Sequence, residues 1–248
     1  MTDPAPRTDI RRSGDRFRTR TDWLDSHHSF SFGEHYDPDN TSYGVLLVHN
    51  EDVLAPGGGF DTHPHRETEI VTWVLDGSLT HEDSAGHRGI TRPGLVQRMS
   101  AGSGIEHSER NGSQDSPVHY VQMWVAPDEF GTEAGYEQLE VDDGLLAAGL
   151  VPVASGLDRH LASPAVRLRN RSAALSVARP PAGAEVLLPA APFLHLFVAR
   201  GTVHVEGIDT SGQLAAGDAG RFTGAVERRV TAETAAEILV WEMHASIG

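Results

Sequence analysis

Short apolar runs recur along the whole chain, and turn residues separate them. They comprise residues 43–50, 68–75, 119–126, 194–200, 202–207 and 236–243, and are rich in β-branched and aromatic residues. Runs of this length and composition are typical of β-strands, whereas helices need longer segments with a 3.6-residue period. Many short strands between Gly and Pro residues predict an all-β protein, built as a sandwich or a closed barrel.

Glycine-containing dipeptides mark several of the expected turns. Asp76-Gly77 lies between TWVL and SLTHE, and Asp-Gly between apolar runs is a strong signal for a β-hairpin. Arg200-Gly201 has a similar place in the second half of the chain. We therefore expect a hairpin at each of these two positions.

The strand-rich segments fall into two blocks. The segment 127–150 between them is acidic and contains several glycines, so we interpret it as a linker region that includes a short helix at most. At 248 residues the chain is long enough for two β-domains of ordinary size. The pattern predicts a first domain over residues 1–130, a linker over 131–155 and a second domain over 156–248.

Composition narrows the classes of function. The net charge of −15 would repel a phosphate backbone, which makes nucleic acid an improbable partner. Arginines crowd the first twenty residues, but aspartates alternate with them, and we favour a solvated or strand-forming leader over a basic binding arm. No apolar run approaches a membrane span, and the N-terminus lacks the apolar core of a signal peptide. We expect a cytoplasmic protein.

The absence of cysteine and the uneven distribution of histidine together direct attention to the first half. Without cysteine, any metal ion must be held by nitrogen and oxygen atoms. Ten of the fourteen histidines fall between His27 and His119. Candidate metal chemistry therefore belongs to the first domain.

Two motifs in this half share a spacing of two residues. His63 and His65 flank Pro64, and His107 is followed by Glu109. In a strand, residues i and i+2 point to the same face, so two such strands can present three imidazoles and one carboxylate to a common centre. Pro64 cannot donate to a β-ladder, which predicts an edge strand for the first motif. The alternative is four unconnected polar residues on half-exposed strands.

Three nitrogens and one carboxylate oxygen suit several divalent metals. Affinity order alone does not choose between Fe(II), Mn(II), Ni(II), Co(II) and Zn(II). We take Fe(II) as the leading candidate and the other four as alternatives. Four protein ligands would saturate a tetrahedral zinc, whereas a five- or six-coordinate metal keeps open positions for substrate or dioxygen. The expected cofactor is one divalent transition metal.

The residues around these motifs resemble the pirin family of bicupins, and especially its bacterial members that act as quercetin 2,3-dioxygenases. The resemblance rests on GGGFDTHPHRETEIVTWVLDGSLTHEDSAGH and MSAGSGIEHSERN, preceded by DWLDSHHSFSFGEHYDPDNTSYGVLLVHNEDVLAPG. It covers about residues 8 to 126 densely. It implies an all-β fold with two tandem cupin-type domains, of which the second carries no metal.

The resemblance also implies the roles of individual residues. In pirins the metal glutamate follows the second-motif histidine by two positions, so His63, His65, His107 and Glu109 would be the ligands. Glu69 stands where a general cupin motif has its glutamate, and we expect a supporting role for it instead. The second motif departs from the general cupin pattern, because Ser100 replaces a proline and two extra residues separate Gly102 from His107.

The implied activity is a metal-dependent dioxygenase that opens a flavonol-like ring, with quercetin as the reference substrate. Ring opening would release carbon monoxide, and Glu109 would act as general base on the 3-hydroxyl of the substrate. The expected partners are a small aromatic or enolisable substrate and dioxygen, with no membrane, and we expect a monomer. The alternative is a pirin-like regulatory protein that binds a transcription factor or metabolic enzyme, with the metal as redox switch.

Overall fold

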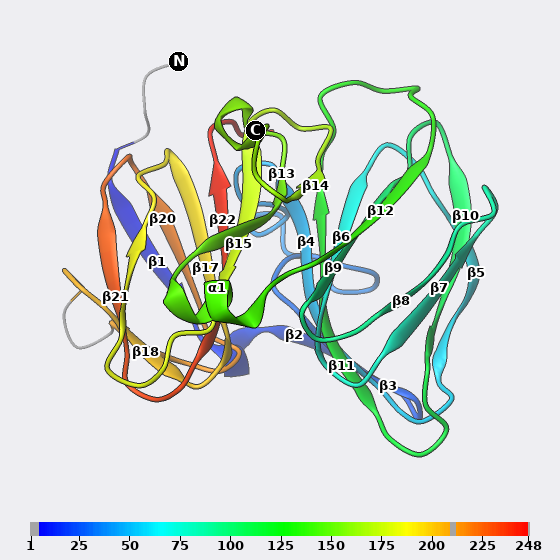
Figure 1. The fold of residues 1–248 in the computed structure, drawn as a ribbon, viewed down its shortest axis with the longest axis horizontal. Coiled ribbons are helices and arrows are strands. Elements are labelled where there is room, and N and C mark those ends of the chain that lie inside the picture. The colour runs from blue at the N-terminus through cyan, green and yellow to red at the C-terminus, as the bar shows by residue number, and fades with distance from the viewer. Residues whose placement is uncertain (1–4, 209–211, 248) are drawn as a thin grey trace.

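The computed structural model describes residues 5–208 and 212–247, and strands dominate these residues. They form two seven-stranded and two four-stranded sheets. One sheet of each size lies in each half of the molecule, as Figure 1 shows. The predicted all-β, bicupin fold class is confirmed, and every predicted strand segment overlaps an observed strand.

The first half holds the sheets that carry the candidate motifs. Its seven-stranded sheet contains, in spatial order, β12 (Gly135–Glu140), β9 (Leu95–Ser100), β6 (Glu69–Asp76), β11 (Val118–Val125), β4 (Leu46–Leu54), β3 (Leu24–His28) and β2 (Phe17–Arg20). Its four-stranded sheet contains β5 (Gly59–His65), β10 (Ile105–Asn111), β7 (Leu79–Asp83) and β8 (Arg88–Thr91). Strand β5 lies at an edge, as Pro64 predicts.

The second half repeats this arrangement. Its seven-stranded sheet contains β1 (Arg7–Arg11), β20 (Ala219–Thr223), β17 (Phe193–Arg200), β22 (Glu237–Met243), β15 (Ala173–Ala178), β13 (Val151–Ser155) and β14 (Val166–Arg167). Its four-stranded sheet contains β16 (Glu185–Leu188), β21 (Arg228–Ala232), β18 (Thr202–Val205) and β19 (Gln213–Ala215). Short 3₁₀ turns occur at Ser13–Asp15 and Asp158–His160.

The two hairpin predictions are wrong. Strands β6 and β7 flank Asp76-Gly77 but belong to different sheets, and β17 and β18 do the same around Arg200-Gly201. Each dipeptide therefore turns the chain from the large sheet to the small one. Gly77 is required there, because its φ of 77° is left-handed and an added Cβ would lie 2.7 Å from the carbonyl oxygen of Pro117.

The segment expected to be a linker contains regular structure. Strand β12 pairs with β9 of the first half, and helix α1 (Asp143–Ala148) follows it. The Asp142 side chain accepts a hydrogen bond from the backbone N–H of Leu145 and so caps this helix. In the described part of the chain, no helix is long and apolar enough to cross a membrane. The domain boundaries stay a prediction.

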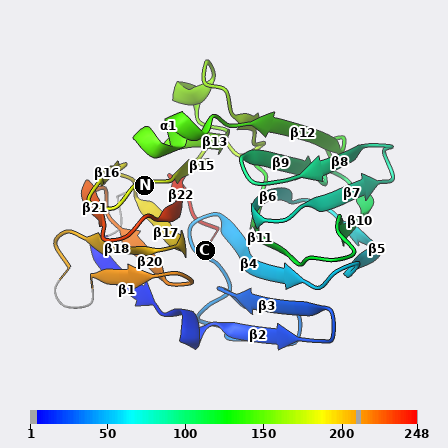
Figure 2. The same ribbon diagram turned by 60° about the horizontal axis from the view of Figure 1, so that its bottom comes forward.

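The arginine-rich leader forms strands, and its first strand crosses to the other half of the molecule. Strand β1 pairs with β20, whereas β2 pairs with β3, and Figure 2 shows β1 beside β20. Arg12 donates to Asp218 at 2.8 Å, and the nearly buried Arg16 donates to Glu51 at 2.6 Å. These two arginines are therefore paired within the chain.

The largest hydrophobic core lies between the two seven-stranded sheets. It takes Val71 and Trp73 from β6 and Val121 and Met123 from β11 on one side. The other side is formed by β15, β17 and β22, with Trp241 at its centre. The indole N–H of Trp241 points at the sulfur of Met123, 3.2 Å away. The two halves thus share one apolar core.

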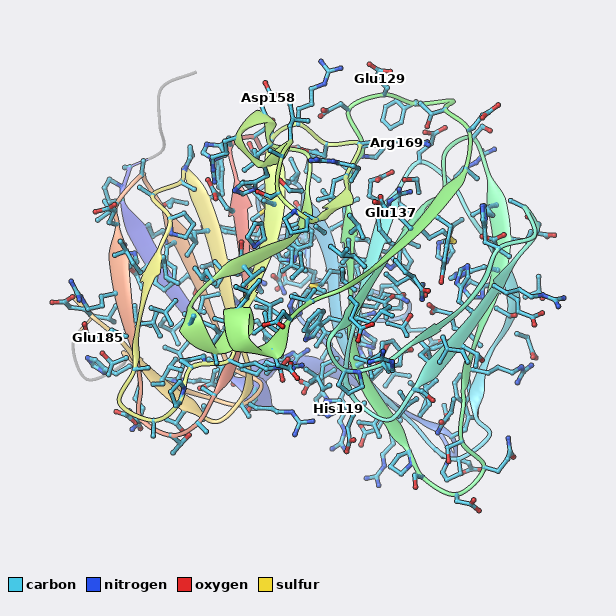
Figure 3. The ribbon with its side chains drawn as sticks, viewed as in Figure 1. His119, Glu129, Glu137, Asp158, Arg169 and Glu185 are labelled. Carbon is cyan, nitrogen blue, oxygen red and sulfur yellow. The ribbon has the colours of Figure 1, made fainter. Side chains whose placement is uncertain are left out.

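Polar contacts surround this shared core. Buried Arg221 of β20 donates to the side-chain oxygen of Asn40 and to the carbonyl of Ser29, each at 2.8 Å. At another edge the backbone N–H of Arg169 donates to Glu69, and Figure 3 labels Arg169 close to where the halves meet. Glu69 also accepts from the Ser100 hydroxyl at 2.8 Å. Glu69, on β6 of the first half, is therefore hydrogen-bonded to residues of both halves.

Two histidines are enclosed where the halves meet. His49 and His195 are 0% exposed, and their rings lie 4.8 Å apart. Burial lowers the pKa of both well below the ordinary value, and the neighbouring imidazole or the Arg221 charge lowers it further. Neither nitrogen of His195 has a hydrogen-bond partner among the described residues.

We predict that Met123→Ala destabilises both halves together. The side chain is fully buried in the shared core, so its truncation should reduce the free energy of unfolding by about 2–5 kcal/mol. Chemical denaturation followed by tryptophan fluorescence and by circular dichroism should still give one coincident transition. Leu145→Ala, at a half-exposed position on α1, is the control and should change little. Two separate transitions would contradict unfolding of both halves through the shared core.

We also predict that His195 makes folding stability sensitive to acid. Its folded pKa is lowered, so the unfolded chain binds the proton first, and stability falls as pH drops below about 6.5. One such group contributes a slope of about 1.4 kcal/mol per pH unit. Denaturation of His195→Phe between pH 7.5 and 5 should show a correspondingly smaller slope. The exposed His204→Phe should keep the wild-type slope, and equal slopes in all three proteins would refute the prediction.

Candidate metal centre

Two neighbouring antiparallel strands hold the four predicted ligand residues. In the register between β5 and β10, His107 faces His63 directly, and Glu109 faces Phe60 across a bulge between His107 and Glu109. Burial alternates along β10, so His107 and Glu109 point inward while Glu106 points to solvent. The two-residue spacing of each motif thus brings its side chains to the inner face.

The three histidines form a compact cluster. The ligand atoms of His63, His65 and His107 all lie within 4.8 Å of one another. Their ring centroids are separated by 4.5 Å to 4.9 Å. The Nδ1 atom of His63 lies 2.7 Å from the carbonyl oxygen of Asp61, a contact that requires Nδ1–H and leaves Nε2 free.

Glu109 lies deeper, beside this cluster. A carboxylate oxygen of Glu109, a nitrogen of His107 and a nitrogen of His81 also lie within 4.8 Å of one another. Its Oε2 atom accepts a hydrogen bond from the amide of Gln122 at 2.8 Å. Burial raises the pKa of Glu109 to about 7; the Gln122 hydrogen bond opposes this, and Asp52 adds to it. A bound cation would favour its ionised form.

Several potential metal-ligating atoms at this point have no hydrogen-bond partner among the described residues. They are Nε2 of His65, Nε2 of His107 and Oε1 of Glu109, and all three are buried. Buried polar atoms are normally hydrogen-bonded, so this set requires an explanation. A divalent cation at this point would be a partner for such lone pairs, and nitrogen with carboxylate oxygen is a donor set that transition metals accept. The residues therefore fit a metal ion.

The electrostatics of the imidazoles also suit a cation. Burial lowers the pKa of His65 to about 4, with a further contribution from His63. Burial likewise lowers the pKa of His107, with further contributions from His65, His63 and His81. Metal ligation requires the neutral imidazole, so these two rings are in the ligating form at neutral pH without losing a proton.

A cavity of about 500 Å³ opens beside the cluster. His63, His65 and Glu109 form part of its wall, and the remaining walls combine apolar rings with polar groups. These further lining residues include Leu24, Phe32, Phe60, Trp124, His28, His35, Asn50, Asp52 and Gln122. A volume of this size accommodates a small aromatic molecule.

Polar side chains continue across the inner face of the large sheet. His28 pairs with Asn50, Asn50 with Gln122, and Gln122 with Thr72, so they form one row across four strands. The alternate residues of β6 and β11 face the shared apolar core instead. The inner face of this sheet can therefore carry polar side chains, because its other face buries the apolar side chains.

The structure separates the other candidates from the cluster. Glu69 bonds to Ser100 and Arg169, as a supporting residue would. His27 and His28 lie on opposite faces of β3, and only His28 reaches the cavity. His119 donates its Nε2–H to Glu51 at 2.9 Å, away from the ligands. In the second half, His204 is exposed on β18.

Sequence reasoning assigned no role to four contributors to this site. Gln122 holds Glu109, and Trp124, which packs against a small apolar cluster, places its ring edge-on to His65 at 4.8 Å. His81 contacts His107 from behind, with Asp83 beyond it. A signal existed for His81 and Asp83, because they repeat the two-residue spacing of the other motifs. For Gln122, it was the polar interruption in HYVQMWVA.

Comparison with known sequences identifies relatives along most of the chain. A family profile described as Pirin matches residues 11–125. A Mycobacterium tuberculosis (strain ATCC 25618 / H37Rv) protein named "Putative quercetin 2,3-dioxygenase" is 59% identical over 97% of this chain and 96% of its own. The Escherichia coli (strain K12) protein named quercetin 2,3-dioxygenase is 44% identical over 54% of this chain and 58% of its own.

Solved structures give the same result for the fold. YhhW from Escherichia coli superposes with a TM-score of 0.88 at 29% identity, covering 98% of this chain and 100% of that one. The structure of this bacterial pirin in complex with nickel(II) gives a TM-score of 0.87 at 28% identity, over 97% of this chain and 100% of that one. Since sequence identity and fold agree over nearly the whole length, the chain belongs to the pirin family.

Proposed function

We propose that this protein is a metal-dependent dioxygenase that opens the ring of a flavonol-like compound. The observation that carries the proposal is the cluster of His63, His65 and His107, with Glu109 close to His107, beside a 500 Å³ cavity whose wall includes His63, His65 and Glu109. Relatives named quercetin 2,3-dioxygenase support the reaction class.

In this proposal His63, His65, His107 and Glu109 hold one divalent transition metal. The unpartnered Nε2 atoms of His65 and His107 and the Oε1 atom of Glu109 would be three of its ligand atoms. When bound, the metal would act as a Lewis acid toward a substrate oxygen. The nickel(II) complex of YhhW supports a divalent ion, and we keep Fe(II) as the leading candidate.

Glu109 has a second role in this proposal. A carboxylate can take the proton from an acidic hydroxyl that is placed within hydrogen-bond reach. Gln122 engages only Oε2, so the other oxygen of Glu109 is not used within the protein. Its carboxylate lies beside both the cation site and the cavity, where the enolic hydroxyl of a flavonol would be deprotonated.

The cavity walls suit a planar aromatic substrate. Phe32 and Trp124 contact each other edge to face at 5.6 Å and give one apolar side. His28 and Asn50 give a polar side that can hydrogen-bond to ring hydroxyls. Enclosure between them would exclude bulk water from the reacting oxygen atoms.

We predict that Glu109→Gln greatly reduces turnover. Glutamine cannot accept the proton, so kcat for aerobic quercetin loss should fall by ~10²–10⁴-fold. The assay follows flavonol absorbance together with oxygen uptake, in protein loaded with Fe, Mn, Ni or Co, with metal content measured in each sample. Glu106→Gln is the matched control, since Glu106 lies on the same strand but faces solvent. If none of the wild-type metal forms consumes flavonol with oxygen, the proposed activity is wrong.

A second prediction concerns the metal itself. Elemental analysis of the protein as isolated should find about one equivalent of a divalent transition metal, held at a single site. His63→Ala removes one ligand and should abolish stoichiometric metal, whereas His204→Ala, in the second half, should retain it. Equal metal content in wild type and His63→Ala would exclude the proposed ligand set.

A further inference from the structure

A second pair of side chains stands directly behind the cluster. Strand β7 runs beside β10, and its register places His81 next to Glu109 and Asp83 next to His107. The Nδ1 atom of His81 lies 3.3 Å from Nδ1 of His107, and its Nε2 lies 3.3 Å from Oδ2 of Asp83. His81 thus connects the carboxylate of Asp83 to His107, the buried histidine of the cluster.

The hydrogen-bond chemistry of these contacts has one consistent solution. A neutral imidazole carries one N–H donor and one acceptor nitrogen. If Nε2 of His81 donates to the carboxylate of Asp83, its Nδ1 must accept, and Nδ1 of His107 must donate. Nε2 of His107 then keeps a free lone pair, and this is the atom that has no partner in the described structure.

The reverse assignment fails on the same contacts. If Nδ1 of His81 donated to His107, a neutral His81 would place a bare nitrogen against a carboxylate. His107 would then carry its proton on Nε2, the atom that would bind the cation in the proposed site. Asp83 is already an acceptor, since its Oδ1 accepts backbone N–H groups of Ala85 and His87.

Packing holds this pair in place. His81 is 1% exposed, and the Tyr136 ring stacks on it at 4.9 Å with an interplanar angle of 28°. The Tyr136 hydroxyl in turn donates to Gln97 at 3.0 Å. Because His81 has little freedom to rotate, its contact with His107 is maintained by the surrounding side chains.

We propose that Asp83 and His81 act as positioning residues that hold His107 in the Nδ1–H tautomer and aim its Nε2 atom at the metal. This inference rests on His107 being a ligand, as proposed above, but it assigns a role to two residues that the ligand set does not include. A hydrogen-bonded second imidazole also strengthens the donor character of the ligating ring.

The three-residue grouping of His81, His107 and Glu109 is explained by the same arrangement. Their ligand atoms also lie within 4.8 Å of one another. The His107 nitrogen on the His81 side is already engaged in the hydrogen bond to His81. His81 therefore supports the metal site from behind and does not form a second site.

The first test reads the tautomers directly. In the metal-free, full-length protein, two-bond ¹H–¹⁵N correlation spectra should show His107 protonated on Nδ1 and His81 on Nε2. In His81→Leu, the signal of His107 should move toward a mixture of tautomers. A wild-type spectrum with His107 protonated on Nε2 would overturn the proposal, whatever the protein catalyses.

The second test uses a pair of variants matched in size. Asparagine at position 81 can place an acceptor oxygen near the position of Nδ1, whereas leucine has a similar shape and no acceptor. His81→Leu should weaken binding of Fe(II) or Ni(II) by about 10–100-fold, and His81→Asn should recover most of this loss. His87→Leu is the control, because His87 also bonds to Asp83 and stacks on Tyr136 but does not touch His107.

The outcomes separate the two proposals. If the wild type binds no metal stoichiometrically, the proposed function fails while the tautomer measurement still stands. If the wild type binds metal and His81→Leu binds it equally well, the positioning role is wrong. If leucine and asparagine weaken binding equally, the effect is one of packing, and the positioning role is likewise wrong.

Discussion

The back-to-back packing of two seven-stranded sheets is the constraint on which the rest of this molecule depends. Trp73 and Met123 from one half meet Trp241 from the other, and all three are fully buried. Burial of large apolar side chains contributes roughly 1.5–3 kcal/mol each. This hydrophobic burial takes place between the two seven-stranded sheets. The space between the large and small sheets of the first half can therefore hold polar residues. The polar row across the inner face of the first half is consistent with this division.

The candidate metal centre shows the cost of that polar interior. Three of its groups are bonded on one side only: buried Glu109 to Gln122, buried His107 to His81, and partly exposed His63 to a backbone carbonyl. Burial lowers the pKa of His65 and raises that of Glu109, so both favour the neutral form. A bound cation would reverse this balance for the carboxylate and would give free lone pairs of these residues a partner. A site that is poorly satisfied alone becomes well satisfied with an ion.

Some features followed from local spacing, and others did not. The two-residue motifs predicted the inward direction of His107 and Glu109, and Pro64 predicted an edge strand, because both are properties of a single strand. The turns at Gly77 and Gly201 were recognised, but their strands join opposite sheets. Turn chemistry specifies a reversal of the chain, whereas pairing depends on which distant strand covers each edge. The same limit applies to β1, which leaves its own half to pair with β20.

The sequence by itself determined the all-β class, the family resemblance and the four candidate ligands, because these are written in alternation, spacing and residue type. Only the tertiary structure decided that His107 faces His63 across β5 and β10, that Gln122 holds Glu109, and that His81 stands behind His107. Such contacts join residues from different strands. Their geometry is set by register and by the packing of whole sheets, and no local pattern in the chain encodes it.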